Sequence, residues 1–180
     1  MNIAVFFGGR SCEHDISIIT GVQVLNALGD GYRVLPVYMK DGGFYTSDLM
    51  TDVGFFENPN LKKATRIWLI DGSFYTRKGM LLLKKETPDV ALICCHGGEG
   101  ENGVLQGFLE YNGVPYTSAG LIASSVCMDK SIAKQLLDGL MLNTMPSITV
   151  HRGDFEKNTN DVIRHVSTFL EYPLIVKPSG

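Results

Sequence analysis

Two glycine-rich loops hold the residues whose types and spacing could do chemistry. The first, residues 8–17, contains Glu13, and the second, residues 96–103, begins with His96. A carboxylate where a strand turns into a helix can receive an ammonium group, or it can simply complement the positive end of the helix. A histidine at the end of a strand can donate a hydrogen bond to a carboxylate or phosphoryl oxygen, or cap the sheet edge. Glu13 and His96 are therefore candidate contacts for a small charged substrate.

Two lysines add a second candidate chemistry. Lys130 stands at the joint of two expected helices, and Lys177 ends an apolar strand-like run. A lysine in such a place can reach a phosphate as a point charge, although either one alone could equally be a solvated surface residue. Cys94 and Cys95 lie inside an apolar run, which is typical of buried thiols rather than of a nucleophile.

The elements around these loops predict an α/β fold. Residues 2–7 form a continuous apolar strand, residues 15–28 show helical spacing of apolar positions, and residues 33–39 form a second strand. A further buried strand, residues 90–95, leads through the second loop into a helix at residues 104–111. This alternation favours a mainly parallel sheet with flanking helices, in which ligands bind at the carboxyl ends of the strands. Both glycine-rich loops occupy that position.

The remaining segments are less regular. Between the second strand and the strand at 90–95 we expect an insertion that begins irregularly at residue 41, with a hairpin of residues 66–70 and 74–77 and an edge strand at 80–83. Past residue 111 we expect the following elements in order: a strand at 114–116, helices at 123–129 and 131–140, a strand at 145–150, a helix at 161–170 and a strand at 172–177.

Composition excludes several classes of protein. The chain has 180 residues, enough for one sizeable domain or for one domain and part of another, and a formal net charge of -3, which excludes a generally basic nucleic-acid binder. Its longest apolar runs fall far short of the ~20 residues that a membrane span requires. Its first residues do not read as a secretory signal, and none of its four cysteines forms a C-x-x-C pair. We therefore expect a protein of the reducing cytoplasm without disulfides or zinc.

Taken together, five segments resemble the N-terminal part of the D-alanine–D-alanine ligase family of ATP-grasp enzymes. No single segment would suffice, but all five occur in the family's order. They are FGGRSCEHDIS at residues 7–17, HGGEGENGVLQG at 96–107, PYT at 115–117, SSVCMDK at 124–130 and VKP at 176–178.

The resemblance implies a fold, a reaction and a role for each candidate residue. Residues 1–120 would form a Rossmann-like substrate domain that precedes the ATP-grasp region, and residues 121–180 the first part of the ATP-grasp domain. The family uses ATP to phosphorylate one D-alanine to an acyl phosphate, which the amine of a second D-alanine attacks, for the peptidoglycan precursors of the cell wall. By resemblance, Glu13 would hold the ammonium group of the first D-alanine, His96 would lie by its carboxylate, and Lys130 and Lys177 would contact the phosphates of ATP.

The same resemblance sets expectations about cofactors and partners. The family's ligands for Mg²⁺ are expected beyond residue 180, so we expect this chain to provide no metal ligand and to be inactive alone. The resemblance also implies a homodimer. From the charge and the short apolar runs we expect neither a nucleic acid nor a membrane as partner. Two alternatives stay open: a related ligase with D-lactate or D-serine as acceptor, and a truncated, non-catalytic module that binds a small molecule. We also expect the last sixty or so residues to be poorly soluble in isolation, because they would expose apolar faces.

Overall fold

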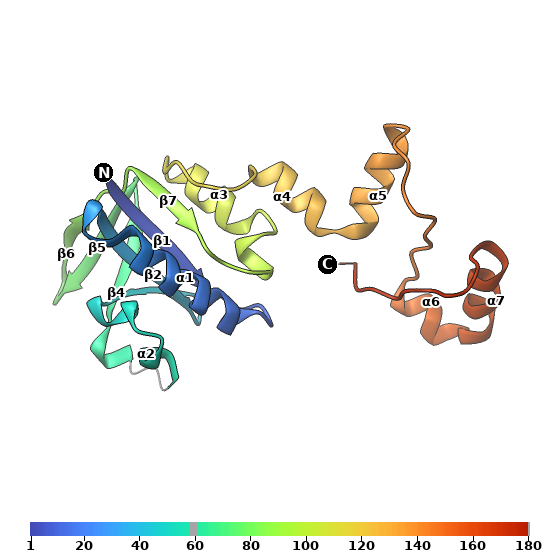
Figure 1. Ribbon diagram of the computed structural model, residues 1–180, viewed down its shortest axis with the longest axis horizontal. Helices are drawn as coiled ribbons and strands as arrows, with labels where there is room; N and C mark the ends of the chain where they lie inside the picture. Colours follow the sequence, from blue (N-terminus) through green and yellow to red (C-terminus); the bar gives the residue numbers. More distant parts are fainter. Residues whose placement is uncertain (58–60, 180) are drawn as a thin grey trace. The chain divides into compact units, whose positions relative to one another are not determined.

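A seven-stranded sheet organises the first of two units into which the chain divides, Met1–Ser125 and Val126–Gly180. The computed structural model describes residues 1–57 and 61–179 (Figure 1). The strand order is β6-β5-β4-β3-β2-β1-β7. The strands are β1 (Asn2–Gly8), β2 (Arg33–Lys40), β3 (Gly43–Thr46), β4 (Thr65–Ile70), β5 (Ser73–Lys78), β6 (Leu81–Glu86) and β7 (Val90–Ile93).

Strand β1 lies between two parallel neighbours and is buried on both faces. It pairs in parallel with β2 and with β7, and its residues 3–8 are all buried. Helix α1 (His14–Leu28) packs Ile18, Val22 and Leu25 into the hydrophobic cluster on one face. Helix α3 (Val104–Tyr111) packs Leu105 and Leu109 into the cluster on the other. The predicted βαβ unit and the predicted helix at 104–111 are thus confirmed. The continuous apolar run of β1 is explained by its burial on both faces of the sheet.

The prediction of a mainly parallel sheet is wrong, because the sheet is mixed. Every pairing from β2 through β6 is antiparallel. Tight turns connect β2 to β3 at Asp41–Gly42 and β4 to β5 at Asp71–Gly72, and all four of these residues have positive φ. Such two-residue turns join antiparallel strands, whereas a parallel pair needs a long crossover. The predicted hairpin and edge strand are confirmed, and they extend the sheet itself.

The other elements of the first unit are short. The predicted strand at 114–116 is reduced to a single parallel bridge between Ala91 and Tyr116. No helix in the described part of the chain is long and apolar enough to cross a membrane. The short elements are η1 (Gly29–Gly31), η2 (Asp48–Thr51), α2 (Gly54–Glu57), η3 (Leu61–Lys63), η4 (Gly98–Gly100) and α4 (Leu121–Met128), which runs into the second unit.

The second unit is helical. It contains α5 (Lys130–Gly139), α6 (Arg152–Lys157) and α7 (Thr159–Phe169), so the helices predicted at 131–140 and 161–170 are confirmed. The strands predicted at 145–150 and 172–177 are wrong, because neither segment pairs with a strand among the described residues of this unit. An apolar run becomes a strand only where a neighbour accepts and donates its backbone hydrogen bonds. The assignment of residues 1–120 and 121–180 to two functional domains stays a prediction.

Candidate functional site

The two glycine-rich loops meet at the carboxyl ends of β1 and β7. Because these strands are parallel neighbours, the residues that follow them emerge on the same edge of the sheet. The Ser11 hydroxyl joins the loops, donating to the carbonyl oxygen of His96 at 2.5 Å and accepting from the backbone N–H of Glu13 at 3.1 Å. The fold therefore brings Glu13 and His96, 83 positions apart in the chain, to adjacent loops.

Glu13 presents an exposed carboxylate toward the second loop. It stands immediately before α1, but its side chain makes no capping hydrogen bond to that helix. A Cβ placed on Gly97 would lie 2.8 Å from Oε2 of Glu13, and Gly97 has a φ of +66°, so only glycine fits there without strain. The carboxylate thus lies against the backbone of the second loop, where it is open to an incoming cation.

The imidazole of His96 is held by helix α1. Its Nε2 lies 2.9 Å from Oγ1 of Thr20, and the ring is half-buried. Thr20 follows Glu13 by seven residues, two helical turns, so one face of α1 carries both the carboxylate and the side chain that orients the histidine. No group among residues 1–57 and 61–179 makes a hydrogen bond to the Nδ1 atom of His96, so this nitrogen is available to a ligand.

A third side chain on the same face of α1 fastens the strand ends. Ser17 is fully buried, its hydroxyl accepts from the backbone N–H of Gly8 at 2.9 Å, and it donates to the carbonyl of Cys94 at 3.3 Å. Sequence reasoning missed Ser11, Ser17 and Thr20. The spacing of positions 13, 17 and 20 could have identified the last two of these residues. It places polar side chains along one side of the predicted helix, beside its apolar face.

His14 supports the first loop from beneath. Its Nδ1 lies 2.6 Å from the carbonyl oxygen of Gly9, and its Nε2 lies 3.1 Å from the hydroxyl of Tyr38. Burial, with smaller contributions from the negative charges of Asp41 and Asp15, raises the pKa of Tyr38 to about 12. A carbonyl oxygen can only accept, so the imidazole N–H at Nδ1 donates to Gly9. This bond holds the backbone of the loop that carries Glu13.

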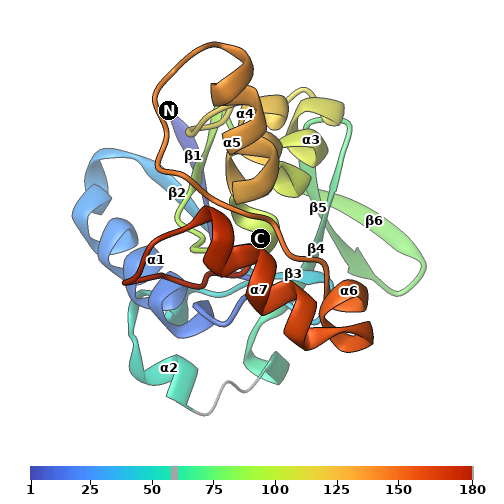
Figure 2. The ribbon, with the colours of Figure 1, turned by 90° about the vertical axis from the view of Figure 1, so that its right-hand side faces the viewer.

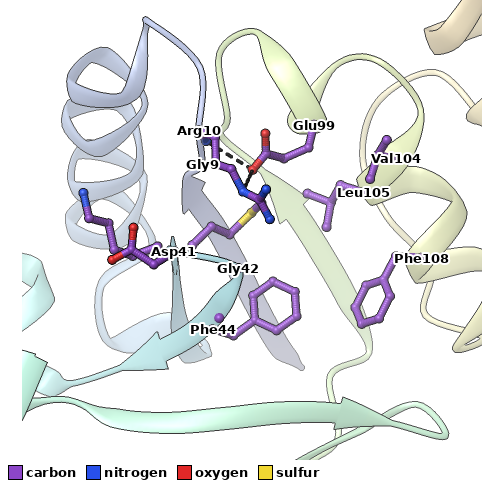
Figure 3. A pocket seen from close by; sticks show the side chains of 12 residues that line it. Gly9, Arg10, Asp41, Gly42, Phe44, Glu99, Val104, Leu105 and Phe108 are labelled. Atoms are coloured by element: carbon purple, nitrogen blue, oxygen red, sulfur yellow. Dashed lines mark hydrogen bonds and ion pairs between the residues drawn. The ribbon is translucent and has the colours of Figure 1, made fainter.

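A cavity of about 430 Å³ opens at the same sheet edge (Figure 3). Phe44 and Phe108, with ring centroids 5.6 Å apart, line it together with Leu105. On its rim, Oε1 of Glu99 accepts from the backbone N–H of Arg10 at 3.1 Å and lies 3.8 Å from the guanidinium Nε. Glu13 and His96 are not among its lining residues, so the cavity lies beside the two candidate residues and does not contain them. Glu99 is a second tie between the loops that sequence reasoning did not identify.

The paired thiols below the second loop are not nucleophiles at neutral pH. Cys94 and Cys95 are both buried, as predicted. Burial raises the pKa of Cys94 to about 11 and that of Cys95 to about 12. Both side chains therefore remain protonated and contribute packing.

The two candidate lysines both belong to the second unit. The backbone N–H of Lys130 donates to the carbonyl of Ser179 at 2.7 Å, and Ser179 follows Lys177 by two positions. Asp129 caps α5 by accepting from the N–H groups of Ser131 and Ile132. It also accepts from the hydroxyl of Ser179 at 2.7 Å, which lowers its pKa. Backbone contacts thus bring the segments of Lys130 and Lys177 together, while their contact with ATP stays a prediction.

The chain matches one family model, and many individual proteins are related to it in sequence. The family model described as D-ala D-ala ligase N-terminus matches residues 2–119. A D-alanine–D-alanine ligase of Thermosipho africanus is 37% identical to the chain over 185 residues, and one of Staphylococcus epidermidis is 35% identical. Both alignments cover 99% of this chain but 49% of the relative, so the chain spans about half the length of the curated relatives it matches.

Solved structures give the same picture. The D-alanine–D-alanine ligase of Helicobacter pylori superimposes with a TM-score of 0.81 at 24% identity, covering 99% of this chain and 55% of that one. The VanG D-Ala:D-Ser ligase of Enterococcus faecalis superimposes with a TM-score of 0.76 at 25% identity, covering 99% of this chain and 52% of that one. The fold of this chain is therefore that of one half of such ligases.

Proposed function

We propose, from the premise that this chain belongs to the D-alanine–D-alanine ligase family and carries its N-terminal domain, that it supplies the site for the first D-alanine. The parent protein would be an ATP-dependent ligase that joins two D-alanines through an acyl phosphate, for peptidoglycan precursors of the cell wall. The 180-residue polypeptide by itself would bind the first D-alanine without completing the reaction, since it matches only half of the relatives' length.

The observation that carries the proposal is the pairing of Glu13 with His96 across the two joined loops. D-Alanine is a zwitterion, so its binding site needs an anion for the ammonium group and a hydrogen-bond donor for the carboxylate. The exposed carboxylate of Glu13, beside Gly97, offers the first, and the imidazole of His96, held by Thr20, offers the second. Because Ser11 fastens one loop to the other, both groups are positioned before the substrate arrives, which lowers the entropy cost of binding.

The proposed role of the lysines is electrostatic. In the transfer of the γ-phosphoryl group of ATP to a carboxylate, negative charge gathers on the phosphate oxygens, and Lys130 and Lys177 would offset it as point charges. Within residues 1–57 and 61–179 there is no group of three or more carboxylate, histidine or cysteine side chains that could hold a metal ion. We therefore assign no Mg²⁺ ligand to the described residues and no step to a metal here.

The acceptor is proposed to be a second D-alanine. Relatives at 37%, 35% and 32% identity are named as D-alanine–D-alanine ligases. A second candidate, D-serine, is favoured by the likeness to the D-Ala:D-Ser ligase of Enterococcus faecalis. Product formation by the parent protein with each acceptor distinguishes the two candidates.

We also propose that the protein is cytoplasmic and forms a homodimer, in line with the family resemblance. Sedimentation velocity checks the second statement directly. A monomer at micromolar concentration would contradict it.

Titration calorimetry of the 180-residue chain with D-alanine tests the proposed binding site. The unmodified chain should bind D-alanine, and Glu13→Gln should weaken binding by about 10-fold or more, because a charge-assisted bond to the ammonium group is lost. Asp15→Asn is the matched control: it removes the same charge from an exposed residue two positions along the chain, in the first turn of α1, and it should leave binding unchanged. In the full-length protein, Glu13→Gln should raise the KM for the first D-alanine.

Three results would contradict parts of this proposal. D-Alanine-dependent release of ADP by the 180-residue chain alone would show that it is not inactive. Equal weakening by Asp15→Asn would mean that Glu13 acts only through general charge. An absence of heat with both D-alanine and ATP would remove the binding site from this chain altogether.

A further inference from the structure

One face of the sheet extension β4–β6 carries cations and aromatic rings side by side. Trp68, Tyr75 and Lys84 are direct neighbours across the three strands, so their side chains leave the same face. The guanidinium of Arg66 lies over the ring of Trp68, 5.7 Å from its centroid. Arg77, two positions from Tyr75, shares the face and is exposed. We call these residues, Arg66, Trp68, Tyr75, Arg77 and Lys84, the basic sheet face.

The opposite face of the same strands belongs to the hydrophobic core. Ile67, Leu69 and Phe74 alternate with the residues of the basic sheet face and are buried in the cluster beneath α3. The basic sheet face is therefore the side of these strands turned away from that cluster. Packing against the cluster does not explain why cations and aromatic rings gather on this face.

An apolar tip adjoins the basic sheet face. Met80, in the turn from β5 to β6, is 94% exposed. Leu81 and Leu82, the first residues of the outermost strand β6, are 69% and 52% exposed. Figure 2 shows this hairpin projecting at the outer end of the sheet. Single exposed apolar residues are common, but consecutive ones on an edge strand mark an interaction surface or an aggregation hazard.

The charge of the region selects the partner. Residues 65–86 contain five Lys or Arg residues and two acidic ones, Asp71 and Glu86, whereas the whole chain has a net charge of -3. Glu86 is further offset by Arg33, whose guanidinium lies 3.5 Å from it. Self-pairing of two β6 edges is disfavoured, because it would place Lys84 and Lys85 of one copy near those of the other. The surface instead matches a partner that is anionic and offers an apolar layer beneath its charges.

We propose that the β5–β6 hairpin and the basic sheet face dock on the surface of a bilayer that contains anionic lipids. Exposed cations attract the headgroups, the rings of Trp68 and Tyr75 suit the interface, and Met80 and Leu81 enter the outermost acyl layer. The expectation of no membrane partner rested on the absence of a spanning segment, which peripheral docking does not need.

Strand direction leaves the candidate substrate site open during this docking. Strand β5 runs antiparallel to β1, as the chain of pairings from β1 to β5 requires. The β5–β6 turn therefore lies on the edge of the sheet where β1 begins, whereas Glu13 and His96 follow the ends of β1 and β7. The docking surface and the substrate site lie at opposite edges of one sheet, so that the bilayer can be contacted without covering the loops.

The only tryptophan of the chain, Trp68, reports on this contact directly. The 180-residue chain is mixed with vesicles of phosphatidylglycerol and phosphatidylcholine in equal parts, or of phosphatidylcholine alone. Anionic vesicles should shift the Trp68 emission to shorter wavelength, and 0.5 M NaCl should reverse the shift, because screening weakens exposed charges. Neutral vesicles should leave the spectrum unchanged.

Two variants separate the charged and apolar contributions. Lys84→Gln with Lys85→Gln should lower the partition coefficient on anionic vesicles by about 30-fold, since each cation near such a surface contributes about fivefold. The matched control, Arg152→Gln with Lys157→Gln, removes the same charge from exposed positions of α6 and should leave partitioning within about twofold. Met80→Ser with Leu81→Ser should reduce partitioning by about 10-fold or more while its salt dependence persists.

Several outcomes would overturn the proposal. Vesicle binding without a Trp68 shift would assign the binding to the exposed helices of the second unit. Equal loss in the control variant would reduce the effect to net charge. Self-association that Met80→Ser with Leu81→Ser abolishes, in the absence of vesicle binding, would identify a second copy of the chain as the occupant.

Discussion

The two units of the chain follow the same local rules for forming helices but differ in how far their side chains are buried. In the first unit Phe6 and Phe7 are completely buried between helices on both faces of the sheet. In the second, none of the residues of α5, α6 and α7, all of which the structure describes, is buried. Helices form in both units because their hydrogen bonds are internal to one segment. Within the described part of the chain, strands form only in the first unit, where each pairs with a neighbour.

Helices α3 and α5 show the difference most directly. Both were predicted as helices from the sequence, and both exist. Leu109 of α3 is fully buried, whereas Leu136 of α5 is 50% exposed. An amphipathic pattern therefore specifies that a helix has an apolar side, but only the neighbouring elements determine whether that side is buried.

The largest expected contrast comes from truncating an aromatic side chain. Phe6→Ala should lower the free energy of unfolding by about 3–5 kcal/mol, because it removes a buried ring that contacts Phe44 and Phe74 and leaves a cavity. Leu136→Ala in the second unit should change it by about 0.5 kcal/mol or less. Urea unfolding of both variants measures the contrast, and comparable losses would show that the second unit is as well packed as the first.

Adding a methyl group at a glycine tests the same difference in packing between the two units by filling space instead of creating a cavity. A Cβ on Gly21 of α1 would lie 2.4 Å from Cγ and 2.5 Å from Cβ of Phe7, so Gly21→Ala should cost about 1–3 kcal/mol. Gly139→Ala in α5 is the matched control, since a Cβ there meets nothing within 4 Å. It should be neutral or stabilise α5 by up to about 1 kcal/mol. In thermal unfolding, Gly21→Ala should lower the midpoint temperature, whereas Gly139→Ala should raise it slightly or leave it unchanged.

Alkaline pH should destabilise the first unit through its buried thiols and phenol. The pKa of Cys95 is raised from 9.0 to about 12 in the folded chain, and those of Cys94 and Tyr38 are raised to about 11 and about 12. The unfolded chain ionises these groups first, so their contribution is complete below about pH 9 and is lost as the pH rises toward 12. Urea midpoints measured from pH 8 to pH 11 should fall. A flat profile would contradict the assigned burial, and Cys95→Ala should make the decline shallower.

The smallest effect is expected at an exposed helix cap. Asp129→Ala removes the acceptor for the N–H groups of Ser131 and Ile132, so the first turn of α5 should exchange its amide hydrogens faster. The main unfolding transition should stay in place. The pKa of Asp129 lies below its ordinary value, chiefly because Ser179 donates to it, so the ionised cap should persist above about pH 4 and weaken in stronger acid. A shift of the global transition would show that α5 is part of the main core.

The composition and periodicity of the sequence predicted the elements whose evidence is local. The apolar run at residues 2–7, the helix beginning near residue 15 and the hairpin around Asp71–Gly72 are all present, because turn chemistry and spacing act over a few residues. The expectation of a mainly parallel sheet was wrong, since strand direction depends on which neighbours pair, and the predicted hairpin joins the sheet through antiparallel pairings. The strands expected at 145–150 and 172–177 failed for the same reason.

For the candidate site, the sequence by itself determined which residues carry chemistry: Glu13 and His96 at the ends of apolar strands, and the glycines beside them. Tertiary structure alone decided how they are held. Ser11 and Thr20 contact His96 across 85 and 76 positions of the chain. No local pattern encodes such contacts, because they exist only once β1 and β7 pair in parallel and α1 packs across them. The sequence pattern therefore identifies the candidate residues, whereas the parallel pairing of β1 with β7 brings them together as a site.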